Sequence, residues 1–260
     1  NPIDWKIRRG YLAGGKELAG PVGLGSDAAG VVDEVGEGVT DTAVGDEVFG
    51  LGSQTQAEYA VLRTWVAKPA SVDWAVAAGA GVAGETAVRV LDLLGLGTGS
   101  TVLIDGASGG VGAIAVQVAV ARGATVVGTA SDRNHGYLSS VGALPVSYGP
   151  GLVERVRAAA PAGLDGVFDV VGKTPVEDLL ALAPEPGQVV SIANFGAAST
   201  GIRATGGGEG EPRDALAEVG RLLAEGRLVI ETRRYPFAEA AQAHAESEAG
   251  HVRGKLVLVP

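Results

Sequence analysis

The residues best suited to chemistry are glycines in one short stretch, residues 106–112 (GASGGVG). The stretch fits the pattern A-x-G-x-x-G at Ala107, Gly109 and Gly112, with Ser108, Gly110 and Val111 between them. A small first residue allows a tight turn, Gly109 lets the backbone approach a pyrophosphate, and Gly112 lets helix and strand pack closely. Unpaired N–H groups and the positive end of the helix dipole then favour phosphate. The pattern predicts a dinucleotide phosphate site, and the alternative is a structural glycine turn.

The segments around this turn have the character needed to position it. An apolar, β-branched run at 101–105 precedes it, and an Ala-rich run of helical length, 113–121, follows before a second apolar run at 125–130. Strand, glycine turn, helix and strand form a βαβ unit, as the motif requires. Further strands are expected at 144–148, 166–171 and 188–193, and helices at 134–141, 152–160, 175–183 and 214–223. Apolar strands alternating with helices predict a parallel sheet covered on both faces.

The rest of the chain predicts a second, smaller domain. Residues 25–50 contain short β-type runs interrupted by glycines, which is typical of a small antiparallel β-barrel. Residues 1–12 show no clear period, and Asn1-Pro2 favours a turn. The tail predicts a strand, a helix at 237–249 and a strand at 255–260, both strands returning to the barrel. We therefore expect domains at 1–84 and 85–226, with 227–260 rejoining the first.

The amino-acid composition argues against several classes of protein. The net charge is −10, and nothing resembles a basic stripe, which argues against a nucleic-acid partner. Cysteine is absent, which removes disulfides and thiolate-bound zinc. No uninterrupted apolar run reaches the length of a membrane span, and no signal segment opens the chain. We expect a cytoplasmic protein.

The end of the second strand bears on cofactor choice. NAD sites place an acid about 20 residues after the glycines, to hold the ribose 2′-hydroxyl. Ser131 lies there, 131 − 109 = 22 residues after Gly109. Ser131 can donate to a 2′-phosphate and Arg133 can pair with it, so we expect NADP(H). Two alternatives remain: Asp132 weakens this preference if it points inward, and Arg133 can simply begin a solvated helix.

Four groups of residues together resemble the medium-chain dehydrogenase/reductase superfamily, in its zinc-free, NADPH-dependent quinone oxidoreductase branch. They are 1–4 (NPID), the barrel signature at 25–32 and 45–48, the turn and helix at 107–117, and Gly254-Lys255. The resemblance implies a Rossmann domain with a doubly wound parallel sheet and a GroES-like β-barrel domain. Where zinc-dependent relatives carry His-Glu, this chain has Ser26-Asp27. The resemblance therefore implies no metal, and the histidines His135, His244 and His251 are expected at surface or helix positions.

The resemblance also implies an activity, a site and an assembly. NADPH would reduce a quinone or an α,β-unsaturated carbonyl, and a homodimer would form through an uncovered sheet edge near 202–205. Tyr11 is expected as proton donor or as packing at the cleft wall, and Asn1 and Asp4 shape the nicotinamide side. The cofactor would bind residues at the glycine turn, the strand ends and the linking helix: Thr86, Arg89, Ser108, Gly109, Gly110, Val111, Gly112, Ser131, Arg133, Asn134, Tyr148, Val170, Val171, Ile192, Ala193, Asn194 and Phe195.

Two other functions remain open at this point. One is an NADPH-binding protein without catalysis, such as a sensor or a crystallin-like protein. The other is an enoyl-thioester reductase.

Overall fold

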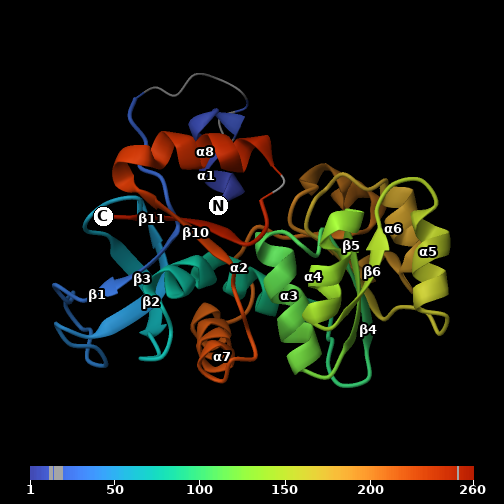
Figure 1. Cartoon of the computed structure of the whole chain (residues 1–260), viewed down its shortest axis with the longest axis horizontal. Helices are drawn as coiled ribbons and strands as arrows, with labels where there is room; N and C mark the ends of the chain where they lie inside the picture. Colours follow the sequence, from blue (N-terminus) through green and yellow to red (C-terminus); the bar gives the residue numbers. More distant parts are fainter. Residues whose placement is uncertain (12–13, 15–19, 251) are drawn as a thin grey trace. The chain divides into compact units, whose positions relative to one another are not determined.

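The computed structural model describes residues 1–11, 14, 20–250 and 252–260, and the chain divides into two compact units (Figure 1). The first unit consists of Asn1–Glu85 and Pro212–Pro260, and the second of Thr86–Glu211. Helix α2 (Trp74–Leu93) begins in the first unit and ends in the second.

Helix α7 (Pro212–Ala224) groups with the first unit, whereas the sequence placed it before a boundary at residue 226. The reason is packing. A Cβ at Gly84 would lie 2.8 Å from Val219, and one at Gly220 would lie 3.4 Å from the ring of Phe49. Arg213 also pairs with Asp41 at 2.5 Å. The sheet domain therefore ends before α7 in the structure.

Among the described residues, the second unit holds a six-stranded parallel sheet in the order β6-β5-β4-β7-β8-β9. Its strands are β4 (Thr101–Asp105), β5 (Thr125–Ala130), β6 (Ala143–Ser147), β7 (Gly166–Asp169), β8 (Val189–Ser191) and β9 (Arg203–Ala204). The order reverses direction at β4, which is the topological switch point of a Rossmann fold. The predicted βαβ unit and parallel sheet are confirmed.

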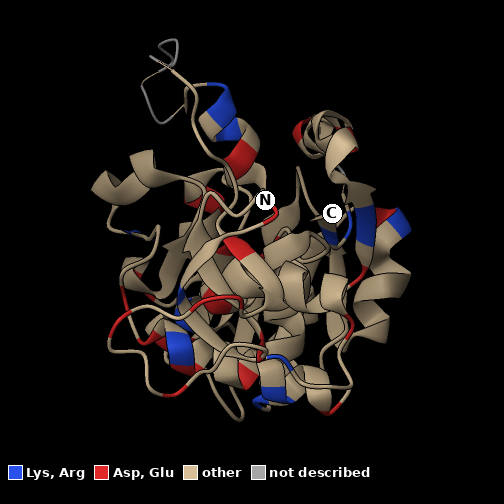
Figure 2. Cartoon of the chain, turned by 90° about the vertical axis from the view of Figure 1, so that its left-hand side faces the viewer, with Lys and Arg blue, Asp and Glu red and all other residues tan. Residues whose placement is uncertain are grey.

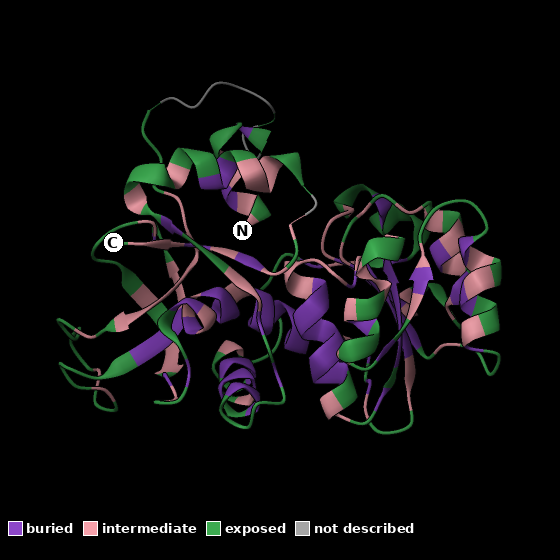
Figure 3. Ribbon diagram, viewed as in Figure 1, coloured by how far each residue is buried: buried purple, intermediate pink, exposed green. Residues whose placement is uncertain are grey.

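Helices cover both faces of this sheet (Figure 1). They are α3 (Gly110–Ala121), α4 (His135–Ser140), α5 (Leu152–Ala159) and α6 (Val176–Leu182), with 3₁₀ turns η2 (Asp132–Asn134), η3 (Pro186–Gln188) and η4 (Phe195–Thr200). Leu152 and Leu179, from α5 and α6, join Leu103 and Val189 of the strands in one buried cluster. The strands and α3 form the buried centre (Figure 3), as apolar strands without alternation predict.

The first unit contains two small sheets among its described residues. Strands β1 (Asp27–Val31), β2 (Glu47–Ser53) and β3 (Val61–Ala67) form an antiparallel sheet in that order. Strands β10 (Thr232–Pro236) and β11 (Lys255–Val259) pair in parallel with each other, joined by η5 (Phe237–Glu239) and α8 (Ala240–Ala249). The tail strands were expected to return to the N-terminal β-barrel. They belong to the same unit as β1, β2 and β3, but they pair with each other in a separate two-stranded sheet.

The N-terminal stretch corrects one local prediction. Asn1-Pro2 was expected to form a turn, but Asn1 is the N-cap of helix α1 (Pro2–Arg8), with Pro2 in its first turn. Proline suits this position because its missing N–H would have no partner there and its φ is already helical. The Asp4 carboxylate also accepts a hydrogen bond from the backbone nitrogen of Asn1 at 2.8 Å.

Two surface observations bear on partners. In the part of the chain that the structure describes, no helix is both long and apolar enough to cross a membrane. Figure 2 shows Lys and Arg interspersed with Asp and Glu in the view that it draws. The expected cytoplasmic location stays a prediction.

Asp105 is a buried carboxyl group at the carboxyl end of β4, with 2% of its surface exposed. The Thr129 hydroxyl donates to its Oδ1 at 2.5 Å. Burial raises the pKa of Asp105, hydrogen bonds from Thr129 and Thr174 oppose the rise, and nearby Asp169 adds to it. Because the folded-state pKa is raised, the wild type loses stability as pH climbs from 3.8 through that pKa.

We expect Asp105→Asn to stabilise the protein, increasingly so as the pH rises. The amide oxygen can still accept from Thr129, while the cost of a buried charge disappears. The gain should be about 1 kcal/mol, the lower end of what burying an uncompensated polar group costs in protein mutants. Denaturant unfolding at pH 4, 6 and 8 measures it, with the exposed Glu177→Gln as control. A gap between wild type and Asp105→Asn that stays constant with pH would contradict the assignment.

Candidate functional site

The glycine turn joins β4 to α3 and has two different faces. A Cβ at Gly112 would collide with the carbonyl oxygen of Gly106 and lie 2.8 Å from the Cα of Ala107. A Cβ at Gly109 would meet only the Gly106 oxygen, at 3.4 Å. Gly112 therefore provides the close packing of helix on turn, and Gly109 leaves its own backbone open to approach.

Helix α3 begins at this turn without a side-chain cap. Gly109 is the N-cap and supplies no side-chain hydrogen bond, and the first intrahelical bond runs from Ala113 to the Gly109 carbonyl at 2.9 Å. The amides of Gly110, Val111 and Gly112 come before that bond, so helix geometry gives them no partner within α3. These groups can bind an anion.

A group of polar residues gathers at the carboxyl end of β5. The Asn134 amide nitrogen lies 3.2 Å from the Ser108 hydroxyl and 3.3 Å from that of Ser131. Arg133 is exposed, and its guanidinium makes no hydrogen bond or ion pair with any residue that the structure describes. The structure thus brings together Ser108, Ser131 and Asn134 and leaves Arg133 available beside them.

The carboxylate of the neighbouring acid, Asp132, contacts Ser147 and His135 and makes no hydrogen bond to the three polar residues above, all of which the structure describes. Its Oδ1 accepts a hydrogen bond from the Ser147 hydroxyl and lies 3.8 Å from Nε2 of His135. Tyr148 follows directly after β6 and is exposed. Asp132 is therefore held toward the end of β6 by Ser147.

The loops after β7 and β8 carry the remaining expected cofactor residues of the sheet. Val170 and Val171 follow Asp169, and Ile192, Ala193 and Asn194 follow Ser191. Phe195 begins η4 and is exposed, and a Cβ at Gly206 would lie 3.5 Å from its ring. Both loops follow the carboxyl ends of their strands, which is where ligands bind in such folds.

Thr86 and Arg89 are buried on α2. The Arg89 guanidinium donates to the Thr205 hydroxyl at 2.6 Å and lies 3.6 Å from the Glu209 carboxylate. The sequence expected Arg89 to bind the cofactor, whereas its charged head is bonded to these protein groups. Its assignment as a cofactor ligand stays a prediction.

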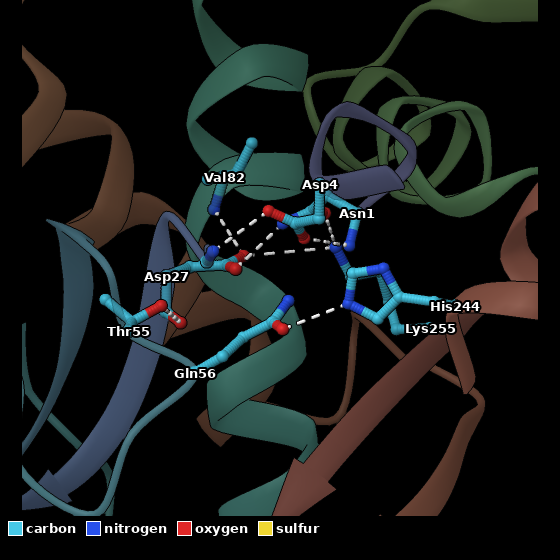
Figure 4. Close-up of polar contacts among 9 residues, drawn as sticks. Asn1, Asp4, Asp27, Thr55, Gln56, Val82, His244 and Lys255 are labelled. Carbon is cyan, nitrogen blue, oxygen red and sulfur yellow. Dashed lines mark hydrogen bonds and ion pairs between the residues drawn. The ribbon is translucent and has the colours of Figure 1, made fainter. Parts of the chain in front are cut away.

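The first unit holds a separate polar cluster, drawn in Figure 4. The Asn1 amide nitrogen donates to Oδ1 of Asp27 at 2.8 Å, and the Val82 N–H donates to Oδ2 at 3.0 Å. The Lys255 ammonium donates to the Asn1 side-chain oxygen and lies 3.9 Å from Oδ2 of Asp27. Asp4, which is 3% exposed, accepts from the N–H of Gly25 at 3.0 Å. The Asn1 side-chain amide thus joins the buried Lys255 ammonium to the partly buried Asp27 carboxylate, and the buried Asp4 lies next to them.

His244 lies in helix α8, the second of the two expected kinds of position, and it is buried beside this cluster (Figure 4). Its Nε2 is 3.0 Å from the Gln56 side-chain oxygen, and its Nδ1 has no hydrogen-bond partner among the described residues. Burial is the main cause that lowers the pKa of His244. His251 lies outside the described residues.

Tyr11 lies apart from these bonds in the first unit. Its ring packs edge-on against Trp5, with centroids 5.8 Å apart, and 62% of its surface is exposed. Whether Tyr11 packs at the cleft wall or acts as a proton donor stays a prediction.

The segment in which zinc-dependent relatives carry metal ligands contains Asp27 in this chain. Asp27 follows Ser26, and both of its carboxylate oxygens accept hydrogen bonds from Asn1 and Val82. The described part of the chain contains no group of three or more His, Cys, Asp or Glu side chains arranged to hold a metal.

Sequence reasoning missed several polar residues that the fold assembles. Lys255 and Asp27 were recognised only as parts of family motifs, and Asp169 and Ser191 were counted as strand residues. The available signal was a charged or polar residue inside an apolar strand, as in KLVLV, GVFD and VVS. Such residues are expensive to bury without partners.

Comparison with known proteins identifies the family. Residues 1–126 match the model of the alcohol dehydrogenase GroES-like domain, and residues 142–258 match that of the zinc-binding dehydrogenases. The first unit is accordingly a GroES-like domain and the second a Rossmann domain.

Individual relatives match the whole chain. It is 30% identical to an NADPH-dependent alkenal/one oxidoreductase of Arabidopsis thaliana, covering 100% of this chain and 69% of that protein. It is 32% identical to a quinone oxidoreductase of Pseudomonas aeruginosa, covering 100% and 88%. A structure of Escherichia coli quinone oxidoreductase with NADPH superposes with a TM-score of 0.83 at 26% identity, covering 100% and 88%. The chain belongs to the medium-chain dehydrogenase/reductase superfamily, in its quinone oxidoreductase-like branch.

Proposed function

We propose that the protein is an NADPH-dependent oxidoreductase that reduces quinones or α,β-unsaturated carbonyl compounds without zinc. The observation that carries the proposal is the uncapped start of α3 beside a phosphate-compatible group of serine, asparagine and arginine. The names of the relatives, an alkenal/one oxidoreductase and quinone oxidoreductases, support the substrate class.

The glycine turn fits the pyrophosphate of a dinucleotide. Gly109 has no neighbour that would prevent close approach, and the amides of Gly110 and Val111 stand at the positive end of the α3 dipole. The loops after β7 and β8 would hold the nicotinamide half, through Val170, Val171, Ile192, Ala193, Asn194 and Phe195. Thr86 and Arg89 complete the proposed set.

The group at the end of β5 fits a 2′-phosphate better than a bare hydroxyl. Ser108, Ser131 and Asn134 supply short polar donors, and Arg133 supplies an unpaired positive charge. Asp132 accepts a hydrogen bond from Ser147, so part of its charge is engaged by a protein donor. Tyr148, exposed after β6, is proposed as a further contact.

NADPH supplies the hydride, so the chain's own task is to orient the reactants and stabilise charge. Reduction of a conjugated carbonyl leaves negative charge on oxygen, which needs a donor or a proton. Asn1 and Asp4, which hold helix α1 and the backbone at Gly25 in place, are proposed to shape the nicotinamide side of the site. Tyr11 is the proposed proton donor, because a phenol can act as a general acid.

The proposal is tested by mixing the purified chain with NADPH and three acceptors: a quinone, an enone and an enoyl thioester. We expect NADPH oxidation with the quinone or the enone, unchanged after chelation, and no stoichiometric zinc by elemental analysis. Turnover with the thioester alone would favour an enoyl-thioester reductase. Binding of NADPH without any turnover would favour a cofactor-binding protein without catalysis, and loss of zinc together with activity would contradict the metal-free proposal.

Arg133→Ala should weaken NADPH binding by about one to two decades and leave NADH binding nearly unchanged. A charge-assisted hydrogen bond contributes roughly 1.5–3 kcal/mol, which corresponds to that range. Ser131→Asp should go further, because it adds repulsion to the 2′-phosphate and an acceptor for the ribose of NADH. Titration of both cofactors measures this. Equal weakening of NADPH and NADH by Arg133→Ala would show that these residues are wrongly assigned.

We also propose a homodimer formed through β9. Among the described residues, β9 pairs only with β8, so its other side presents unpaired backbone groups. The Thr205 N–H bonds back to Ser191 at 3.0 Å, and successive amides of a strand alternate in direction. The Ala204 N–H therefore points to the open edge.

Ala204→Pro should convert the dimer to a monomer, because proline removes the outward N–H while the bond of Thr205 remains. Sedimentation at micromolar concentration measures the mass, and NADPH titration of the variant serves as the control for folding. A wild type that sediments as a monomer contradicts the proposal.

A further inference from the structure

Asp169 is a buried carboxylate at the carboxyl end of β7, with 1% of its surface exposed. Its Oδ1 accepts hydrogen bonds from the N–H groups of Val171 at 3.0 Å and Gly172 at 2.7 Å. Its Oδ2 accepts from the Ser191 hydroxyl at 2.7 Å. A buried carboxylate is expensive unless it is bonded in this way, so the loop after β7 must keep this shape to retain it.

Ser191 occupies the matching place on the next strand. It is fully buried at the end of β8 and in register with Asp169. While its hydroxyl donates to Asp169, its oxygen accepts from the N–H groups of Ala193 at 3.2 Å and Asn194 at 2.9 Å. The two side chains therefore hold amides of both loops that follow these strands.

The same loops touch each other and the glycine turn. A Cβ at Gly172 would lie 2.9 Å from the Cβ of Ala193, so the loop after β7 packs on the loop after β8. A Cβ at Gly106 would collide with the Val171 side chain, which therefore rests on the turn. Displacement of Val171 would remove the support of the turn that leads into α3.

We propose that Asp169 and Ser191 are positioning residues for the cofactor: their bonded pair sets both loops and braces the phosphate-binding turn. The inference rests on the proposed binding of NADPH. Neither side chain needs to touch the cofactor, because each acts through the backbone amides that it holds.

The hydrogen-bond directions make this pair sensitive to a change of one atom. The Ser191 oxygen already accepts two N–H groups, so its proton must point to an acceptor, which Asp169 provides. Asp169→Asn keeps the size of the side chain but replaces one acceptor oxygen by an NH₂ donor. In one orientation the NH₂ faces the Ser191 hydroxyl, and in the other it faces the N–H groups of the loop after β7, so in both a donor meets a donor. Ser191→Ala instead leaves one carboxylate oxygen and two loop amides without their partner.

The experiment measures NADPH affinity and unfolding for wild type, Asp169→Asn, Ser191→Ala and the double variant. We expect each single variant to bind NADPH about tenfold more weakly or worse, and the double variant to bind more tightly than the product of the single effects predicts. Ser191→Thr keeps the hydroxyl and should restore most of the affinity. Hydrogen exchange at the amides of Ala193 and Asn194 should accelerate in Ser191→Ala.

The matched control is Val156→Ala, which opens a cavity in the core of the same unit at a residue of α5 that belongs to neither loop. It should lower stability without changing NADPH affinity. If wild type binds NADPH and both Asp169→Asn and Ser191→Ala bind it equally well, the positioning role is overturned while the proposed function stands. Failure of wild type to bind NADPH overturns both. If Asp169→Asn does not fold, Ser191→Ala and Ser191→Thr decide the question.

Discussion

The approach of Gly112 to the carbonyl of Gly106 is the contact on which the cofactor side of this molecule depends. Helix α3 can meet β4 at this turn only because no Cβ stands at position 112. Gly109, the N-cap of α3, supplies no side-chain hydrogen bond to the first amides of the helix. An anion site made in this way needs no charged side chain, because peptide dipoles provide the positive potential. The charged residues nearby can then distinguish one cofactor from another.

Polar residues at the ends of buried strands hold the rest of this region in place. Asp105, Asp169 and Ser191 are all buried, and each bonds to a group that belongs to a neighbouring strand or to a loop beyond it. In a low-dielectric interior these bonds are strong, and an unpaired member is costly. The interior of the sheet thereby fixes the conformation of loops at its surface. This explains why apolar strands end in residues that a hydrophobic core alone would not require.

In the first unit, the Asn1 side chain likewise bonds to more than one charged residue. One amide side chain donates to Asp27 and accepts from Lys255, so it joins a partly buried carboxylate to a buried ammonium. Asp4 meanwhile ties helix α1 to the backbone at Gly25. Asn1 and Asp4, which the family resemblance assigns to the nicotinamide side, thus hold the local structure of the first unit together.

The sequence by itself determined the βαβ unit around Gly109, the parallel sheet and the superfamily, because strand period, glycine spacing and helix length are local properties. It also indicated Ser131 and Arg133 from their distance along the chain. It failed at Asn1-Pro2, where the same dipeptide suits a turn or a helix start, and at α7, whose packing on Gly84 and Phe49 depends on distant residues. Only the tertiary structure decided that Asp169 meets Ser191, that Lys255 meets Asn1 and that Arg89 bonds to Thr205. These pairs are separated by 22, 254 and 116 residues. The first pair is set by strand register and the other two by the packing of a helix against distant residues, and no local pattern encodes either.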